Sequence, residues 1–210
     1  WWSPSSGPAA AAHPEVVVRR CEVDAPALVL GSTQDAGVVD VGAARDLGLA
    51  VVRRRSGGGA VLLQPGEATW VDVFLPADHP RWEPRIDRSF DWVSACWLEA
   101  LGSLGVIGAT AHRGPMVADE LGRLVCFAGR GPGEVIVGER KLVGLSQRRT
   151  RAGARLQCLV PHHIDVETYA AVLRPGVDPT ELSRRVTCLD RSGSDVVSAL
   201  VLAMEHDRSR

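Results

Sequence analysis

The chain of 210 residues carries a net charge of −1 at pH 7, and 45% of its residues are hydrophobic and 23% charged. This length suits one domain with a substantial core, while the balanced charge gives no general attraction for nucleic acid or for an anionic membrane surface. Five scattered cysteines without a C-x-x-C pair argue against a disulfide framework and a zinc ribbon, no apolar run could span a bilayer, and we therefore expect a cytoplasmic protein.

The first half of the chain predicts mainly short strands. Residues 1–14, rich in Ser, Pro and Ala, are expected to form a flexible lead-in. Aliphatic runs predict a hairpin from residues 16–23 and 27–30, and Asp35 is placed to cap a weak helix that ends at Leu47. Further strands are predicted at residues 50–54, 60–63 and 69–75.

The second half mixes strands and helices. Apolar residues recurring at helical spacing predict a helix from Ser89 to Leu104. The arginine-rich residues 148–155 predict a basic turn that either faces solvent or meets an acidic partner. Strands are predicted at residues 106–111, 124–128 and 156–160 and on both sides of Lys141, and helices at residues 166–173, 179–184 and 194–205.

Lys141 is the only lysine of the chain, whose 24 Lys and Arg residues are otherwise arginine. A chain that uses arginine elsewhere would tolerate it here, unless this position requires a compact ammonium on a flexible stem. Residues 134–137 and 141–143 predict two strands joined by a short turn, so the side chain would extend from a rigid sheet. A solvated lysine on a hairpin is the alternative.

A glycine-rich segment follows the strand predicted at residues 50–54. Three successive glycines, Gly57, Gly58 and Gly59, allow the backbone to bring its N–H groups close to a phosphate or carboxylate. The guanidinium of Arg54 suits phosphate oxygens. A flexible turn between two strands is the alternative interpretation.

Two polar features allow more than one interpretation. Asp72 faces away from Val71 and Val73 in a predicted strand, and is either a polar rim residue or a contact for metal or substrate. The neighbouring His162 and His163 have no third ligand at a suitable spacing, so we predict no metal site there.

Three segments together resemble the lipoate-protein ligase family, within the wider group of biotin and lipoate ligases. Residues 30–34 (Leu-Gly-Ser-Thr-Gln) are similar to its Leu-Gly-x-x-Gln segment. Residues 53–61 (Arg-Arg-Arg-Ser-Gly-Gly-Gly-Ala-Val) resemble its Arg-Arg-x-Ser-Gly-Gly-Gly-Ala-Val loop, and residues 138–147 resemble its Gly-x-Lys-(x)2-Gly segment. The resemblance implies an α/β (α+β) fold with a mixed, largely antiparallel sheet flanked by helices. The catalytic domain would span residues 15–175, with residues 176–210 as its C-terminal helical portion.

The resemblance also implies a reaction. An enzyme of this family activates lipoate or octanoate with ATP and Mg²⁺ as the acyl adenylate, and transfers the acyl group to a lysine of a lipoyl domain. That domain would belong to a 2-oxoacid dehydrogenase complex or to the glycine cleavage H protein, and we expect no nucleic acid or membrane partner. Lipoate, octanoate and biotin are not distinguished by the sequence, because each presents a carboxylate on an apolar chain.

The resemblance assigns roles to particular residues. Lys141 is expected to lie against the acyl carbonyl and the α-phosphate, with Gly144 and Ser146 lining the site. Asp72 is a further candidate for substrate or nucleotide binding. The glycine loop is expected to hold the carboxyl end of the acyl chain and the phosphates through Arg54, Ser56, Gly57, Gly58 and Gly59.

Cys126 supports an alternative chemistry. Cys126-Phe127 resembles the Cys-Phe of the octanoyltransferases and amidotransferases, which carry the acyl group on that cysteine without ATP. A thiol beside Lys141 would have a lowered pKa, as a nucleophile requires, whereas cysteine in a strand is more often a small buried hydrophobe. A third hypothesis is a protein that binds an acyl or biotinyl ligand without turnover.

Overall fold

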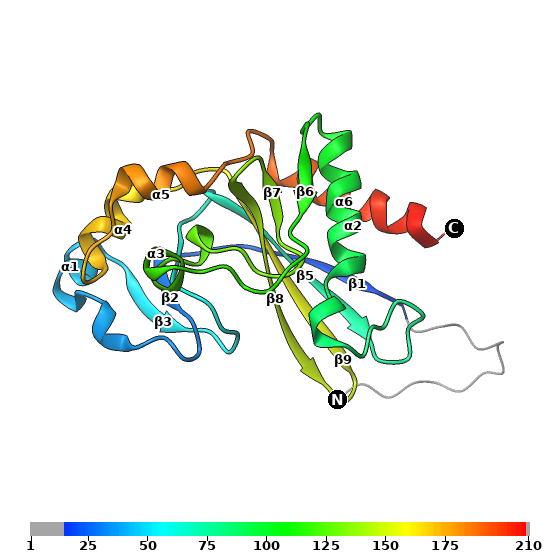
Figure 1. Ribbon diagram of the computed structural model, residues 1–210, viewed down its shortest axis with the longest axis horizontal. Helices are drawn as coiled ribbons and strands as arrows, with labels where there is room; N and C mark the ends of the chain where they lie inside the picture. The colour runs from blue at the N-terminus through cyan, green and yellow to red at the C-terminus, as the bar shows by residue number, and fades with distance from the viewer. Residues whose placement is uncertain (1–14, 209–210) are drawn as a thin grey trace.

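The computed structural model describes residues 15–208, and the predicted lead-in at residues 1–14 lies outside the described residues. Two sheets organise the molecule (Figure 1). The larger sheet has the order β1-β5-β9-β8-β7-β6, with every neighbouring pair antiparallel, and the smaller has the order β3-β2-β4, with β2 and β3 parallel. The larger sheet comprises β1 (Val17–Cys21), β5 (Ala68–Pro76), β6 (Ala109–Ala111), β7 (Val135–Val137), β8 (Arg140–Thr150) and β9 (Gly153–Pro161). The smaller comprises β2 (Ala27–Leu30), β3 (Ala50–Arg53) and β4 (Val61–Leu63). The predicted mixed, largely antiparallel fold is confirmed.

Two long helices, α2 (Asp91–Ser103) and α6 (Gly193–Arg208), cover one face of the larger sheet (Figure 1). Alternation in β5 directs Val71 and Val73 to these helices, where they join Trp97 of α2 in a core without solvent exposure. Burying each such side chain contributes about 1.5–3 kcal/mol. The helix predicted from Ser89 to Leu104 is therefore confirmed, as is the strand predicted at residues 69–75.

The smaller sheet packs with short helices around a second core. Four aspartates begin these helices, because the carboxylate of each accepts a hydrogen bond from a backbone N–H in the first turn. These four helices are α1 (Val41–Asp46), capped by Asp40; α3 (Glu120–Leu124), capped by Asp119; α4 (Val166–Val172), capped by Asp165; and α5 (Pro179–Arg185), capped by Asp178. Single turns of 3₁₀-helix are η1 (Ala36–Val38), η2 (Ile86–Arg88) and η3 (Cys126–Ala128).

The hairpin predicted from residues 16–23 and 27–30 is wrong, because its two strands lie in different sheets. β1 pairs with β5, whereas β2 lies between β3 and β4. Leu28 and Leu30 of β2 are buried in the second core. Pairing of β2 with both β3 and β4 outweighs the preference of residues 24–26 for a tight turn between β1 and β2.

The strand predicted at residues 124–128 is also wrong. Asp119 accepts a hydrogen bond from Gly122 N–H and begins α3, so Leu124 ends a helix and Cys126 begins the turn η3. Only Val125 pairs like a strand residue, in a single bridge to Ala60.

Three other predicted elements are shorter or divided. The helix expected over residues 35–47 is split into η1 and α1, because Asp40 caps a second start. The strand expected over residues 106–111 is confined to β6. The basic turn is only two residues long, because β8 continues to Thr150 and β9 begins at Gly153. No helix among residues 15–208 is long and apolar enough to cross a membrane.

Candidate active site

A bulge in β8 decides where Lys141 points. Strict alternation would place Lys141 on the same face as Val143 and Leu145, which belong to the core beneath the helices. Val143 lies opposite Val135, but the next residue of β7 lies opposite Lys141, so β8 contains one extra residue, Leu142. A bulge of this kind re-aims the neighbouring side chains, and Lys141 is directed to the opposite face.

Lys141 is held by protein groups on all sides. Its side chain is 1% exposed, and Nζ lies 2.7 Å from Oε1 of Glu134. Nζ also donates to the carbonyl oxygens of Cys126, at 2.8 Å, and Gly129, at 3.2 Å, and it lies 5.0 Å from the centroid of the Phe127 ring. The solvated hairpin lysine is thus excluded, and the ammonium occupies one defined position.

Glu134 ties this cation to two backbone segments. Oε2 accepts a hydrogen bond from Gly131 N–H at 2.6 Å, and Oε1 accepts one from Leu145 N–H at 3.2 Å. A buried ion pair needs such additional hydrogen bonds to offset the loss of hydration. Removing either partner would leave the other charge buried without compensation.

The glycine loop lies directly on the segment that carries Cys126. Cys126 N–H donates to Ala60 O at 2.9 Å. A Cβ at Gly59 would lie 2.8 Å from the Cys126 nitrogen, and a Cβ at Gly58 would lie 3.5 Å from Cys126 Sγ. Gly58 also has a φ of +95°, whereas a Cβ at Gly57 would meet open space. Close approach and positive φ therefore require two of the three glycines.

The side chain of Arg54 fixes the conformation of the glycine loop. Its guanidinium donates to the carbonyl oxygens of Gly57 and Gly59, both at 2.8 Å, and of Val29, at 3.1 Å. Within the described residues, the amide N–H groups of Gly57, Gly58 and Gly59 donate no hydrogen bond. Free amides in a glycine loop suit the oxygens of a carboxylate or phosphate. Arg54 thus organises the loop, and the amides remain available for an anion.

An apolar pocket of about 100 Å³ opens where the two sheets meet. Four of the residues predicted for the site line it, namely Arg54, Cys126, Gly144 and Ser146. The rest of its wall comes from Val29, Val61 and Leu63 of the smaller sheet, from Trp70, Leu145, Gln157, Cys158 and Leu159 of the larger sheet, and from Phe127 of η3. The structure thus brings Arg54, the cysteine segment and β8 together around one cavity.

Phe127 and Gly144 connect this pocket to Lys141. A Cβ at Gly144 would lie 3.1 Å from Cζ of Phe127 and 3.5 Å from Cε of Lys141. A side chain at position 144 would press on the ring, which contacts both the ammonium and the cavity. Lys141 does not line the cavity itself but contacts Cys126 and Phe127, which do.

Asp72 and Ser56 are buried but do not line the pocket. The Asp72 carboxylate, 1% exposed, is bound by the guanidinium of Arg155, by Nε1 of Trp70 at 3.0 Å and by Sγ of Cys21 at 3.3 Å. Burial first, and then the hydrogen bond to Asp72, raise the pKa of the Cys21 thiol to about 11. Ser56 is 8% exposed, and its Oγ has no hydrogen-bond partner among the described residues.

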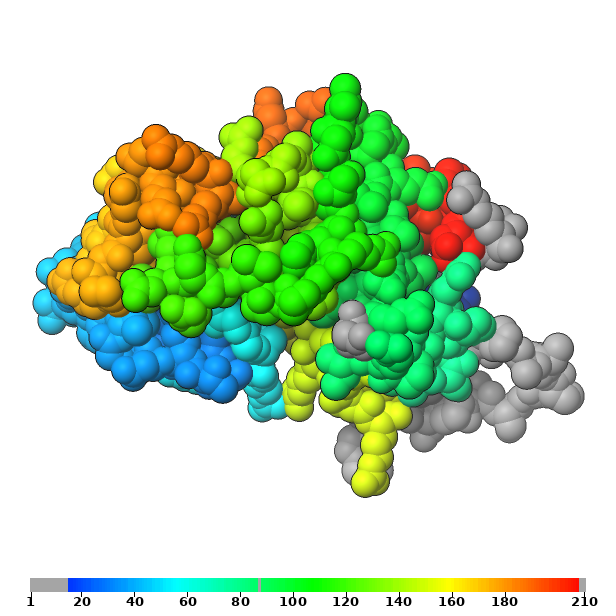
Figure 2. Space-filling view, viewed as in Figure 1, coloured from blue at the N-terminus to red at the C-terminus, as the bar shows by residue number. Residues whose placement is uncertain are grey.

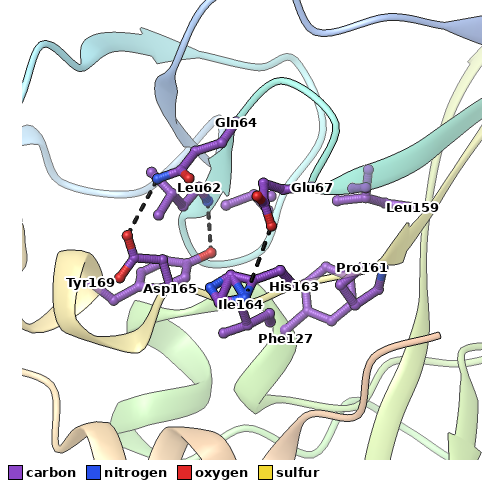
Figure 3. Close-up of a pocket in the computed structure, with 12 residues that line it drawn as sticks. Leu62, Gln64, Glu67, Phe127, Leu159, Pro161, His163, Ile164, Asp165 and Tyr169 are labelled. Carbon is purple, nitrogen blue, oxygen red and sulfur yellow. Dashed lines mark hydrogen bonds and ion pairs between the residues drawn. The ribbon is translucent and has the colours of Figure 1, made fainter. Parts of the chain in front are cut away.

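A smaller hollow of about 20 Å³ lies beside the pocket and shares Val61, Phe127 and Leu159 with it (Figure 3). Its rim is polar. His163 Nδ1 lies 4.0 Å from Glu67 Oε2, and across the hollow the side chain of Asp165 accepts hydrogen bonds. No three His, Cys, Asp or Glu side chains in the described part of the chain are arranged to hold a metal ion.

His162 is not available as a metal ligand either. Its Nε2 lies 2.7 Å from Oγ1 of Thr69, and its Nδ1 lies 2.8 Å from the carbonyl oxygen of Leu189. Both ring nitrogens are therefore engaged inside the protein.

Sequence reasoning missed most of the pocket wall and the partner of Lys141. Phe127 could have been found, because it follows Cys126 in the Cys-Phe pair. Trp70 and Gln157 could have been found only from strand pairing. Trp70 lies two residues before Asp72 and therefore on the same face of β5, and Gln157 lies directly opposite Asp72 in β9. Glu134 lies close to Lys141 in sequence, but the bulge determines that the two side chains meet.

A family model of the lipoyl protein ligase A/B catalytic domain matches residues 9–202. The chain belongs to this family. It is therefore a lipoate-protein ligase-like enzyme, of ligase or acyltransferase type. A comparison with curated protein sequences gives no significant match.

Solved structures of lipoate ligases share the fold. A lipoate protein ligase from T. acidophilum with bound lipoic acid is 20% identical, with a TM-score of 0.71 over 93% of this chain and 74% of that chain. A lipoate-protein ligase A bound with ATP is also 20% identical, with a TM-score of 0.70 and coverage of 93% and 74%. P. falciparum LipL1 in complex with lipoate is 13% identical, with a TM-score of 0.60 and coverage of 92% and 48%.

Proposed function

We propose that this lipoate ligase-like enzyme binds a lipoyl or octanoyl chain in the apolar pocket and transfers the acyl group to the lysine of a lipoyl domain. The observation that carries the proposal is the pocket itself. Its apolar wall suits a saturated chain, and this wall includes Cys126 and Ser146. The glycine loop, with its free amides, lies against the Cys126 segment. The acyl carbonyl would then lie near Cys126, whose backbone carbonyl oxygen accepts a hydrogen bond from Lys141.

An ATP-dependent activation is the first candidate route. The relatives with bound lipoic acid and with bound ATP support it. The amides of Gly57, Gly58 and Gly59 would hold phosphate oxygens, and the acyl carboxylate would attack the α-phosphorus and release pyrophosphate. The carboxylates of Glu134 and Asp72 are paired with Lys141 and Arg155, so Mg²⁺ would be held mainly by the phosphates.

A thioester on Cys126 is the second candidate route, favoured by one specific observation. Sγ of Cys126 lines the pocket beside the glycine loop. The thiolate would attack the acyl carbonyl of a carrier, forming a sulfur–carbon bond as the carrier leaves with a proton. The acceptor lysine would then attack the thioester and release the thiol. The amides of the loop would stabilise the oxyanion in both steps.

The partner in either route is a folded lipoyl domain, which we propose from chemistry and from one relative. A structural study of an archaeal lipoate protein ligase from T. acidophilum includes its E2 lipoyl domain. A lysine at the tip of such a domain can reach a pocket mouth that is open at the surface. Acylation assays with a lipoyl domain of a 2-oxoacid dehydrogenase complex and with the glycine cleavage H protein would decide which of the two is the acceptor.

Intact-mass analysis of an acceptor domain tests the function and separates the routes. Wild-type enzyme would be incubated with lipoate, octanoate or biotin, with and without ATP, and with an octanoyl carrier protein in place of the free acid. We expect acylation of the acceptor by lipoate or octanoate. Pyrophosphate exchange that survives Cys126→Ala identifies the adenylate route, and ATP-independent transfer that disappears in Cys126→Ser identifies the thioester route. Saturable ligand binding without acylation under any condition would refute enzymatic transfer.

A further inference from the structure

Arginine is concentrated at the β8–β9 turn and in the strands beside it. Arg148, Arg149, Arg151 and Arg155 all fall within eight residues, and no acidic residue lies among them. The chain as a whole has a net charge of −1, so this positive charge is local. The tip of the hairpin projects from the body of the molecule, where it is drawn in yellow (Figure 2).

Strand register places two of these arginines next to the acyl pocket. Ser146 and Gln157 lie opposite each other and line the pocket, and Arg148 and Arg155 form the next opposed pair on the same face. Residues two apart along a strand are separated by about 7 Å. The arginine pair therefore begins within one side-chain length of the pocket rim.

A shallow hollow of about 430 Å³ lies over this pair. Its lining includes Phe74, Arg148, Thr150 and Arg155. Phe74, which lies directly opposite Arg155 in the neighbouring strand, is half-buried, and the guanidinium of Arg19 lies 5.3 Å from its ring centroid. Cations thus surround one partly exposed ring on a face that the helices do not cover.

Most of this positive charge is not neutralised within the described residues. Arg155 pairs with Asp72. Arg148 and Arg151 are exposed, and their side chains form no hydrogen bond or ion pair with any described residue; Arg19 has no acidic partner there. Arg148 lies directly opposite Arg155, and Asp72 offsets the charge of Arg155 but not that of Arg148.

Arg149 shows what a structural arginine in this hairpin looks like. It points to the other face, where it stacks on Trp82 at 4.5 Å from the ring centroid. It also donates to the carbonyl oxygens of Glu83 and Pro84 and to Gln147 Oε1. The four contacts account for Arg149 completely, whereas Arg148 and Arg151 have no such contacts.

We propose that Arg19, Arg148 and Arg155 around Phe74, together with Arg151 in the adjoining turn, form the docking surface for the acceptor domain, which presents acidic side chains beside its acceptor lysine. The inference rests on the proposed function. A lysine that reaches the pocket brings its neighbours onto the adjoining face, and that face carries the arginines. A nucleotide, in contrast, would be held by the glycine loop.

Charge reversal of the two unpaired arginines tests this surface. The double variant Arg148→Glu/Arg151→Glu would be compared with Arg45→Glu, a control on α1 whose side chain is 80% exposed. The isolated lipoyl domain is the probe, and its Kd is measured by titration and its KM at saturating acyl donor. We expect the double variant to raise the Kd and KM of the acceptor by roughly tenfold at low salt, with little change at high salt, because rim charges act through screened attraction.

Rescue and substrate controls complete the test. Replacing an acidic residue beside the acceptor lysine with Lys should recover part of the lost affinity in the double variant and weaken binding to the wild type. An unchanged acceptor Kd in the folded double variant would overturn the docking surface, as would a raised KM for ATP or for the acyl donor instead. Acceptor binding that depends on the arginines without any acylation would leave the docking surface standing and refute the proposed function.

Discussion

The two faces of the six-stranded sheet are built on different principles. Towards α2 and α6, alternating residues such as Val71, Val73 and Leu156 form one continuous apolar core. On the opposite face, the polar and charged side chains of Lys141 and Asp72 are as deeply buried, at 1% exposure each. Each of these is held by a specific set of partners. The helix-side face stabilises the fold by burying apolar surface area, and the opposite face holds a few polar groups in defined positions.

The difference between the two faces predicts which positions tolerate substitution. Apolar side chains in a core can exchange with others of similar volume at modest cost. A buried charge cannot lose its partner without a large penalty. Changes on the pocket face should therefore have sharper and more selective effects than changes of similar size on the helix face.

Thiol reactivity should separate the two faces most strongly. Burial raises to about 12 the pKa of Cys96, which lies in the helix-side core, and of Cys158, which belongs to that core and also borders the pocket. Near neutral pH their thiolate populations should therefore be roughly a thousandfold below that of an ordinary thiol. We expect iodoacetamide to label Cys126 and the exposed Cys188 well before them, as measured by peptide mass spectrometry of the native protein. Octanoate should slow labelling of Cys126 but not of Cys188, and equal protection of both would contradict a ligand in the pocket.

Removing the ammonium should produce the next largest effect. Lys141→Met leaves Glu134 buried without its cation, which should lower the free energy of unfolding by about 3–5 kcal/mol. The double variant Lys141→Met/Glu134→Gln should recover part of this stability, because it removes both charges and the amide oxygen still accepts a backbone hydrogen bond, while acyl transfer stays abolished. Urea denaturation and transfer assays on both variants provide the measurement. Recovery of activity together with stability would show that Lys141 is only structural.

The glycine loop offers a matched pair of substitutions. Gly59→Ala places a methyl group 2.8 Å from the Cys126 nitrogen and should cost about 1–3 kcal/mol of stability through overpacking. Gly57→Ala meets open space and should change stability by less than about 0.5 kcal/mol. Thermal denaturation compares the two, and similar losses in both would argue against close contact between the loop and the cysteine segment.

The smallest effect is expected from narrowing the pocket. Gly144→Ala brings a methyl group to 3.1 Å from Phe127 Cζ, so it crowds the ring, and both residues line the pocket. We expect octanoate to bind roughly fivefold more weakly, equivalent to about 1 kcal/mol. Gly102→Ala, at an exposed position of α2, meets nothing within 4 Å and should leave octanoate affinity unchanged. Calorimetric titration measures both variants, and unaltered affinity in Gly144→Ala would place the acyl chain elsewhere.

Sequence patterns predicted the helix-side face well and the pocket face only in part. The helix expected from Ser89 to Leu104 is observed as α2, and the strand expected at residues 69–75 as β5, because one-sided burial imposes a period that the sequence displays. The two strands around Lys141 were predicted for the same reason. The direction of the Lys141 side chain could not be, because the extra residue in β8 is defined by its pairing with β7.

Other features of the site depend on contacts distant in sequence. Cys126 was expected in a strand but begins a 3₁₀ turn, because the helix capped by Asp119 ends just before it. Arg54 was expected to bind an anion, whereas its guanidinium holds the carbonyl oxygens of the loop. In both cases the residue was singled out for its chemistry, and the partners that fix its geometry lie in other elements.

Transfer activity of Lys141→Arg tests most directly whether the lone lysine serves the acyl carbonyl. The rate would be measured per folded molecule, at saturating acyl donor and acceptor, with the folded fraction taken from urea denaturation of the same sample. We expect the rate to fall by about 10²–10³-fold, the usual effect of removing a group that stabilises developing charge, while binding of octanoate is retained. A folded Lys141→Arg variant within about twofold of the wild-type rate, well short of a 10²-fold loss, would contradict this role of Lys141.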